Sequence, residues 1–197
     1  MTQEPDWKSI VESERGLLER EQQPVAGSNG SPIHGNCVTA DHATLSEIHI
    51  RPLREGELPP LDLLLLADPS EELVRSYSKR GSCWVAEWNH EVVGVYVLLE
   101  TRPETVELVN VAVREELQGN GIGKTLVLHA VGTARHAGFR TIEVGTGNSS
   151  IGQLSLYQKC GFRIVGVDID FFVRHYEHPI FENGIQCRDM VRLTRDL

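Results

Sequence analysis

The spacing of hydrophobic and polar positions predicts one mixed domain of strands and helices from residue 47 onward. Alternation with a period of two predicts strands at 47–53, 82–88, 92–101, 105–113, 141–146, 162–173 and 188–193. Hydrophobic residues at helical spacing predict helices at 61–68, 70–80, 123–137 and 151–160. The resulting order, β-α-α-β-β-β-α-β-α-β-β, indicates an α+β fold.

Short polar residues and glycines mark the ends of the predicted helices. Ser70 is a suitable N-cap for the second helix, and Ser150 with Gln153 forms the pattern of a capping box before the last one. Gly138 and Gly161 follow the last turns of the two later helices, where a residue with positive φ commonly ends a helix.

The first 46 residues differ in composition from the rest. Residues 1–47 hold eight acidic and three basic residues, and residues 6–22 show weak helical spacing. The stretch 24–36, rich in Gly, Ser, Pro and Asn, is typical of a linker. We expect a mobile acidic tail over 1–46 that includes a short helix; a helix that docks on the domain or on a partner is the alternative.

Charge, hydropathy and cysteine content narrow the class of protein. A net charge of −9 argues against a nucleic-acid partner, because binding to phosphate backbones needs clustered Lys and Arg. The longest apolar stretch, 92–99, is far shorter than the ~20 residues of a membrane span, so no membrane partner is expected. The four cysteines form no CxxC pair and the N-terminus has no signal-peptide pattern, which predicts reduced thiols in a cytoplasmic protein.

The segment from Gln118 to Lys124, QGNGIGK, carries the most chemical information. It lies between a predicted strand and a predicted helix, and three glycines in five residues allow the backbone to approach a ligand closely. The first N–H groups of the helix have no partner within the helix, and its dipole is positive there. We therefore expect a phosphate-bearing ligand at this point.

Two common phosphate-binding motifs do not fit this segment. A Walker loop requires Gly at position 118, which is Gln, although Gly123-Lys124-Thr125 matches the end of that motif. A dinucleotide fingerprint, GxGxxG, would require Gly at position 124 or 126, which are Lys and Leu. What remains is the pattern Q-x-x-G-x-G.

With the strand VELVNVAV before it and the sequence LYQKCGF after it, this loop resembles the GNAT superfamily of acyl-CoA-dependent N-acetyltransferases. The resemblance covers about 48–197 and implies the GNAT fold: a mixed, mostly antiparallel, splayed sheet with helices on both faces. It also implies that the sheet opens between the strands at 105–113 and 141–146, and that acetyl-CoA enters this gap as acetyl donor.

The resemblance assigns the donor-binding residues by position. The loop amides would hold the pyrophosphate of the coenzyme, and the strand before the loop would pair its backbone with the pantetheine arm. Asn148 matches an Asn that often contacts the cofactor, and the N–H of Val111 would stabilise the carbonyl oxygen. The implied donor-binding residues are Val111, Ala112, Val113, Gln118, Gly119, Asn120, Gly121, Ile122, Gly123, Lys124 and Asn148.

Acetyl transfer to an amine requires a base near the amine and an acid near the leaving sulfur. Tyr157 matches the Tyr of the family's LY-x-K-x-GF helix and is the acid candidate, since a phenol stays protonated at pH 7. Glu107 is the base candidate; unless a bulge intervenes, strand alternation places it on the same side as Val109, Val111 and Val113. The alternatives are a packing role for Tyr157 and a solvated strand carboxylate for Glu107.

The remaining histidines and acids favour other roles. His175-Tyr-Glu-His178 lacks the spacing of a zinc motif, so we expect no metal. His175, Glu177, Glu182 and Asn183 belong to a loop over 173–187, which in this family often borders the acceptor site. His129 and His136 are expected on the surface, and Cys160 in the core.

The sequence thus predicts an N-acetyltransferase domain over 47–197. It would move acetyl from acetyl-CoA to a primary amine by direct attack in a ternary complex, with a small-molecule amine favoured over a protein. The alternatives are an acyl-CoA-binding sensor without turnover and a P-loop nucleotide hydrolase, which Gln118 disfavours. A homodimer is possible by resemblance, because members of the family commonly dimerise.

Overall fold

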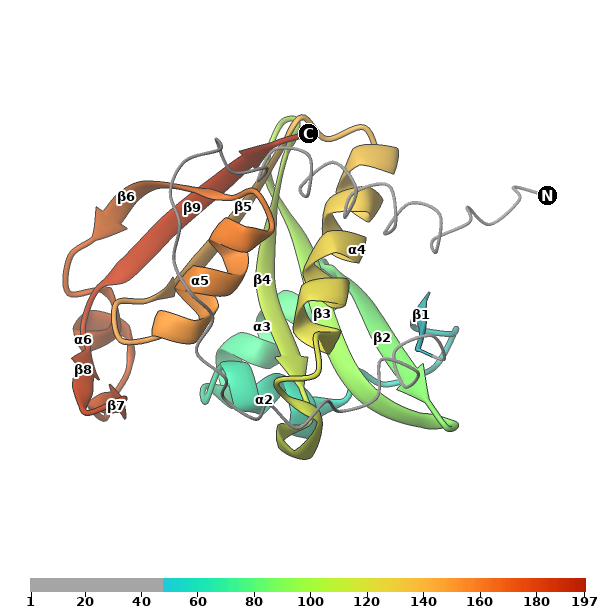
Figure 1. Ribbon diagram of the computed structural model, residues 1–197, viewed down its shortest axis with the longest axis horizontal. Helices are drawn as coiled ribbons and strands as arrows, with labels where there is room; N and C mark the ends of the chain where they lie inside the picture. The colour runs from blue at the N-terminus through green and yellow to red at the C-terminus, as the bar shows by residue number, and fades with distance from the viewer. Residues whose placement is uncertain (1–47) are drawn as a thin grey trace, which may run out of the picture.

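The computed structural model describes residues 48–197, so the expected mobile tail with its short helix lies outside the described residues. Figure 1 shows a twisted sheet with helices on both sides. The strands are β1 (His49–Pro52), β2 (Ser82–Trp88), β3 (Glu91–Arg102), β4 (Thr105–Val113), β5 (Thr141–Gly147), β6 (Arg163–Asp168), β7 (Ile180–Glu182), β8 (Ile185–Cys187) and β9 (Met190–Asp196). The helices are α2 (Leu61–Ala67), α3 (Glu71–Arg80), the 3₁₀ turn η2 (Glu115–Leu117), α4 (Ile122–His136), α5 (Ile151–Lys159) and α6 (Phe171–His175).

The main sheet has seven strands in the order β1-β2-β3-β4-β5-β9-β6. Every neighbouring pair in it is antiparallel except β4 and β5, which are parallel because α4 crosses over between them. The prediction of a mixed, mostly antiparallel sheet is confirmed. A separate small hairpin pairs β7 with β8.

The sheet opens between β4 and β5. Their pairing is confined to Thr105–Glu107 opposite Thr141–Glu143. Figure 1 shows the two strands together at the top and diverging downward, toward the end where α4 begins. The predicted splay is therefore present, and the edge of β4 that faces β5 is unpaired beyond Glu107 within the described sheet.

Helices cover the two faces of the sheet unequally. α4 and α5 bury one face in a large core that includes Tyr96, Leu126 and Ile142. α2 and α3 cover only the half of the other face formed by β2, β3 and β4, in a smaller core that includes Leu64 and Val74. In the described residues, no helix is both long and apolar enough to span a bilayer.

The segment after Phe162 differs from the prediction of a strand to residue 173. β6 ends at Asp168, and Asp170 adopts a left-handed conformation with φ of 57° before α6. Its N–H donates to Asp189 Oδ1 at 2.8 Å, and its carboxylate accepts from Arg188 at 2.6 Å. These long-range contacts hold a turn that the hydrophobic alternation of the segment does not reveal.

The signals at the helix ends have mixed outcomes. The Leu73 N–H donates to Ser70 Oγ at 3.4 Å, and Gly138 and Gly161 have φ of 86° and 82°, so these predictions are confirmed. The capping box is wrong, because the Ser150 hydroxyl makes no cap bond and instead donates to Glu182 Oε2 at 2.5 Å.

The surface position predicted for His129 is also wrong, whereas His136 is exposed as expected. His129 is 1% exposed on the inner side of α4. Its Nδ1 lies 2.8 Å from the Tyr96 hydroxyl, and its ring lies 5.1 Å from that of Trp84. The hydrogen bond to Tyr96 compensates the burial of a polar ring, which helical spacing alone could not show.

Candidate active site

The glycine-rich loop ends at the first turn of α4 and is exposed. Gly119 and Gly121 have φ of 79° and 83°, a region that side chains disfavour, and Gly121 is the N-cap of the helix. These conformations explain why glycine occupies both positions. The loop is open to solvent from Gln118 to Gly121.

The main-chain amides of this loop have no hydrogen-bond acceptors among the residues that the structure describes. Within residues 48–197, the N–H groups from Gly119 to Lys124 donate no hydrogen bond; the first amide of the helix that does so is that of Thr125, to Gly121 O at 3.1 Å. Because α4 is 15 residues long, its dipole adds a positive potential at the same end. The loop therefore has the donors and the polarity that an anionic ligand requires.

Side chains of the loop hold its shape. Gln118 Nε2 donates to Val113 O at 3.0 Å, and Asn120 Nδ2 donates to Leu117 O at 3.2 Å. Ile122 is buried against the core, which fixes the start of α4. The side-chain amides of Gln118 and Asn120 thus shape the loop, whereas the predicted ligand contacts belong to its main-chain amides.

The edge of β4 lies beside this loop. The Arg114 N–H donates to Val93 O of β3 at 2.9 Å. Strand alternation then directs the main-chain groups of Ala112 toward β3 and those of Val111 and Val113 toward the unpaired edge. An extended ligand in the gap between β4 and β5 could therefore form hydrogen bonds with both main-chain groups of Val111 and with the N–H of Val113, whose carbonyl already accepts from Gln118.

A β-bulge interrupts β4 between the two halves of the candidate site. Val97 is opposite Asn110, whereas Leu98 is opposite Leu108, so Val109 is the extra residue. Val111 and Val113 pack with the core under α4, while Val109 packs with the core under α2 and α3. The expectation that Glu107 shares a side with Val111 and Val113 is therefore wrong; it shares the α2/α3 side with Val109.

Glu107 occupies the point where β4 and β5 separate. Its side chain is 22% exposed, and Arg192 Nη1 lies 3.0 Å from its Oε1. Burial raises the pKa of Glu107, and the charge of Arg192 opposes this shift without cancelling it. The carboxylate lines a cavity of about 340 Å³ with Thr101, Arg102, Glu143, Val165, Arg192 and Leu193.

Tyr157 lies on the opposite side of the sheet, in α5. It is 5% exposed, and its ring lies 6.0 Å from that of Phe162. Burial raises the pKa of its hydroxyl, which has no hydrogen-bond partner within residues 48–197. A Cβ placed on Gly123 would lie 3.7 Å from Leu156, so the first turn of α4 and the α5 segment carrying Tyr157 are close neighbours.

The polar atoms of Asn148 are used within the protein. Its Nδ2 donates to Gln186 O at 3.1 Å, and its Oδ1 accepts from the N–H groups of Arg188 and Asp189 at 2.8 and 3.0 Å. The side chain thus joins the end of β5 to the segment between β8 and β9. Its contact with a cofactor stays a prediction.

The loop over 173–187 contains ordered elements as well as candidate acceptor contacts. Glu182 accepts from the Ser149 and Ser150 hydroxyls, and Asn183 Nδ2 donates to Ser149 O at 3.0 Å. These two residues fasten the β7–β8 hairpin to the start of α5. His175 and Glu177 are exposed, and acceptor contacts for all four residues stay predictions.

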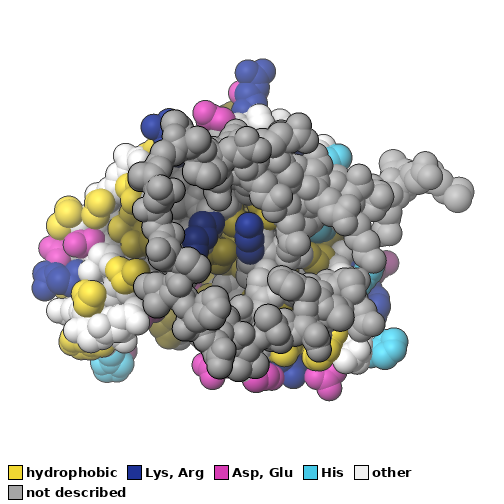
Figure 2. Space-filling model, in the orientation of Figure 1, with side chains coloured by type: hydrophobic (Ala, Val, Ile, Leu, Met, Phe, Trp, Pro, Cys, Tyr) yellow, Lys and Arg dark blue, Asp and Glu magenta, His cyan; other side chains and the backbone are white. Residues whose placement is uncertain are grey.

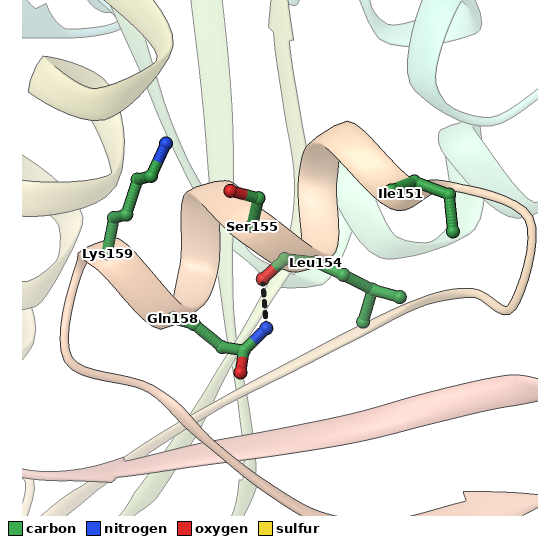
Figure 3. A pocket seen from close by; sticks show the side chains of 5 residues that line it. All are labelled: Ile151, Leu154, Ser155, Gln158 and Lys159. Atoms are coloured by element: carbon green, nitrogen blue, oxygen red, sulfur yellow. Dashed lines mark hydrogen bonds between the residues drawn. The ribbon is translucent and has the colours of Figure 1, made fainter.

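A larger hollow, of about 600 Å³, runs along α5 and was not anticipated from the sequence. Its walls are Ile151, Leu154, Ser155, Gln158 and Lys159 (Figure 3). Lys159 is the Lys of the LYQKCGF motif, and its place in that motif is the one sequence feature that could have marked it as a candidate site residue. Figure 2 shows basic side chains beside hydrophobic ones between α4 and α5, on the face that carries the glycine loop.

Among residues 48–197 no group of three or more His, Cys, Asp or Glu side chains could hold a metal ion. In that range the three cysteines are buried free thiols, and burial raises the pKa of Cys160 to about 11. Cys160 is thus a core residue, as expected, and a poor nucleophile at neutral pH.

Known proteins share this arrangement. The model of the acetyltransferase (GNAT) family matches residues 42–162. The N-acetyltransferase YvbK of Bacillus subtilis (strain 168) is 65% identical over 136 residues, which cover 69% of this chain and 88% of YvbK.

Two solved structures are similar over the described domain. A Bacillus subtilis acetyltransferase in complex with CoA is 60% identical, with a TM-score of 0.73 and coverage of 76% of this chain and 99% of that one. A GNAT family acetyltransferase from Elizabethkingia anophelis with acetyl-CoA bound is 46% identical, with a TM-score of 0.75 and coverage of 77% and 99%. With the splayed sheet and the glycine loop, these matches show that the chain belongs to the GNAT family of N-acetyltransferases and is an acyltransferase.

Proposed function

We propose that this protein transfers an acetyl group from acetyl-CoA to a primary amine by direct attack in a ternary complex. The observation that carries the proposal is the row of unengaged amides from Gly119 to Lys124, which lies beside the unpaired edge of β4. The two relatives with solved structures were obtained with CoA or acetyl-CoA.

The donor fits the chain in two places. The loop amides and the N-terminus of α4 would hold the pyrophosphate, with Lys124 in the first turn adding a positive charge. Val111 and Val113 would pair with the amides of the pantetheine arm. Bound acetyl-CoA supplies a thioester carbon as the electrophile.

Glu107 is suited to take the proton of the amine. An alkylammonium has a pKa near 10.4, so less than about 0.1% is a free nucleophile at pH 7. A general base works best when its own pKa approaches the working pH, and burial raises the pKa of Glu107 in that direction. The carboxylate removes the proton directly or through one water.

Tyr157 is suited to donate a proton to the leaving sulfur. Because burial raises its pKa, the phenol stays neutral at pH 7 and keeps its proton for donation. The Val111 N–H on the open edge of β4 would stabilise the negative charge that develops on the carbonyl oxygen. The groups proposed for the acid and base steps thus lie on opposite sides of the sheet, and the thioester bound in the gap between β4 and β5 would lie between them.

The cavity at Glu107 supports a small-molecule amine. Its volume of about 340 Å³ lies at the lower end of the range for small-ligand sites. Two acids and two arginines line it. The buried free thiols Cys83, Cys160 and Cys187 suit a reducing compartment, which supports a cytoplasmic location.

Calorimetry with acetyl-CoA, followed by a thiol-release assay over monoamines, polyamines, amino acids and peptides with free N-termini, tests the proposal. We expect acetyl-CoA to bind, excess ATP to leave that binding unchanged, and at least one small amine to release CoA. Binding without turnover over the whole panel would indicate the sensor alternative. Failure of acetyl-CoA to bind would overturn the proposal.

A further inference from the structure

An arginine side chain crosses the sheet at the point where β4 and β5 separate. Arg192 of β9 lies opposite Gly145 on β5 and opposite Gly166 on β6. Although β5 lies between β9 and β4 in the sheet, the guanidinium of Arg192 reaches Glu107 on β4. The side chain therefore passes over the middle strand at Gly145.

Gly145 leaves the room for this crossing. A Cβ at position 145 would lie 3.2 Å from Arg192 Nη1 and 2.6 Å from Met190 Sδ. The φ of Gly145 is not in the left-handed region, so the backbone does not require glycine here. Glycine is required because the side chains of Met190 and Arg192 approach too closely for a Cβ to fit.

Three contacts hold the guanidinium in place. Nη1 lies 3.0 Å from Glu107 Oε1, Nε lies 2.7 Å from Asp168 Oδ2 on β6, and the Phe171 ring centre lies 5.6 Å from Cζ. The ring adds a cation–π contact from α6. Nε and Nη1 thus serve different carboxylates, which uses the fork of donors that only Arg provides.

We propose that Arg192 is a positioning residue for the acetyl-transfer site: it crosses β5 over Gly145 and holds Oε1 of Glu107, so that Oε2 is presented to the acceptor amine. Within residues 48–197, Oε2 has no hydrogen-bond partner. This inference rests on the proposed role of Glu107 as base.

Charged groups on four strands surround Glu107 and influence its ionisation. Glu143 on β5 pairs with Arg102 on β3, and Asp168 on β6 pairs with Arg192. Burial and the charge of Glu143 favour the protonated form of Glu107, while Arg192 and Arg102 favour the ionised form. Arg192 thus favours the ionised form of Glu107, which is the form that can accept a proton.

The test measures Glu107 directly and through catalysis. The ¹³C resonance of the Glu107 carboxyl, assigned by its loss in Glu107→Gln, is titrated in the wild type and in Arg192→Met. We expect its midpoint to rise by about one pH unit or more, the typical effect of removing an adjacent Arg. The acidic limb of log(kcat/KM) should move by the same amount.

Two further variants separate positioning from a general effect of charge or folding. Arg163→Met removes an exposed arginine from β6 and should leave both midpoints unchanged. Gly145→Ala keeps the charge of Arg192 but displaces its guanidinium, so it should raise the midpoints by a smaller amount. If Arg192→Met fails to bind acetyl-CoA, Gly145→Ala replaces it as the variant in which the Glu107 midpoint decides the test.

An unchanged Glu107 midpoint in Arg192→Met, or in Gly145→Ala where that variant carries the test, would overturn the positioning role even if Glu107 is the base. An acidic limb that persists in Glu107→Gln would instead reject the base role, and the role of Arg192 in transfer with it. The carboxyl titration would then still report whether Arg192 holds Glu107.

Discussion

At the scale of single residues, the candidate chemistry depends on two groups in different surroundings. Glu107 lies at the apex of the gap between β4 and β5, with an arginine on one oxygen. Tyr157 lies in the apolar core on the other side of the sheet. Burial raises the pKa of both, which suits an acid that keeps its proton and a base that accepts one readily.

Replacing Glu107 with Gln removes the base and keeps the size of the side chain. We expect kcat/KM at pH 7 to fall by about 10²–10⁴-fold and the acidic limb of the pH profile to flatten, because no carboxylate remains to titrate. Calorimetry should show unchanged acetyl-CoA binding. Glu100→Gln, at an exposed position of β3, is the control, and it should leave the profile as it is.

Replacing Tyr157 with Phe removes only the hydroxyl, which has no hydrogen-bond partner within the described residues. We expect thermal stability and acetyl-CoA affinity to stay close to those of the wild type, since the ring still packs against Phe162. The value of kcat should fall by about 10²-fold, the lower range for loss of a general acid. Unchanged kcat would assign Tyr157 to packing alone.

At the scale of elements, the start of α4 joins the donor loop to the core. Gly121 is in the left-handed conformation immediately before the helix, and Ile122 is buried. At the other end of the same helix, Gly138 has nearly the same φ, and a Cβ added there would meet no atom within 4 Å. The two glycines therefore allow backbone strain to be separated from ligand binding.

Gly121→Val places a branched side chain at the mouth of the loop and strains its backbone. We expect the affinity for acetyl-CoA, measured by calorimetry, to fall by at least about 10-fold, the equivalent of one lost hydrogen bond to a charged group. Gly138→Val should cost similar stability, because its φ is equally unfavourable, yet retain the affinity. Equal loss of affinity in both variants would show that strain alone is responsible.

At the scale of the whole molecule, His129 couples α4 to the sheet and makes stability depend on pH. Burial lowers its pKa to about 4, against about 6.5 in the unfolded chain. The unfolded chain therefore binds an extra proton between these values. This contribution to stability is complete above pH 6.5 and is lost as the pH falls toward 4.

The expected loss is on the order of 3 kcal/mol, at 1.36 kcal/mol per pKa unit. Thermal unfolding from pH 7 to 4 should show a falling Tm in the wild type and a shallower fall in His129→Gln, which keeps a hydrogen-bonding side chain for Tyr96. His136→Gln changes an exposed histidine of the same helix and should follow the wild type. Parallel curves for all three proteins would contradict the role of His129.

Much of the fold could be predicted from the sequence because its elements carry local signals. The strands and helices from β1 to α5 lie close to their predicted ranges, and the Gly-rich loop is recognisable from its residues alone. α6 was missed because the apolar residues 171–173 directly follow the strand-like alternation of 167–170, while the turn at Asp170 depends on Asp189 and Arg188. The hollow along α5, with Lys159 in its wall, was also missed. Helical spacing alone does not show whether neighbouring elements cover a helix face or leave it exposed.

The sequence by itself determined the order of the elements from β1 to α5, the family and the position of the glycine-rich loop at Gly119–Lys124, because these depend on residues adjacent in the chain. The tertiary structure decided which side of the sheet Glu107 occupies, that His129 is buried, and that Arg192 reaches across β5. A bulge at Val109 reverses the side of the sheet on which every later residue of β4 lies. The contact of Arg192 with Glu107 depends on the register in which β9 pairs with β5. Neither is encoded in a local pattern of hydrophobic and polar positions.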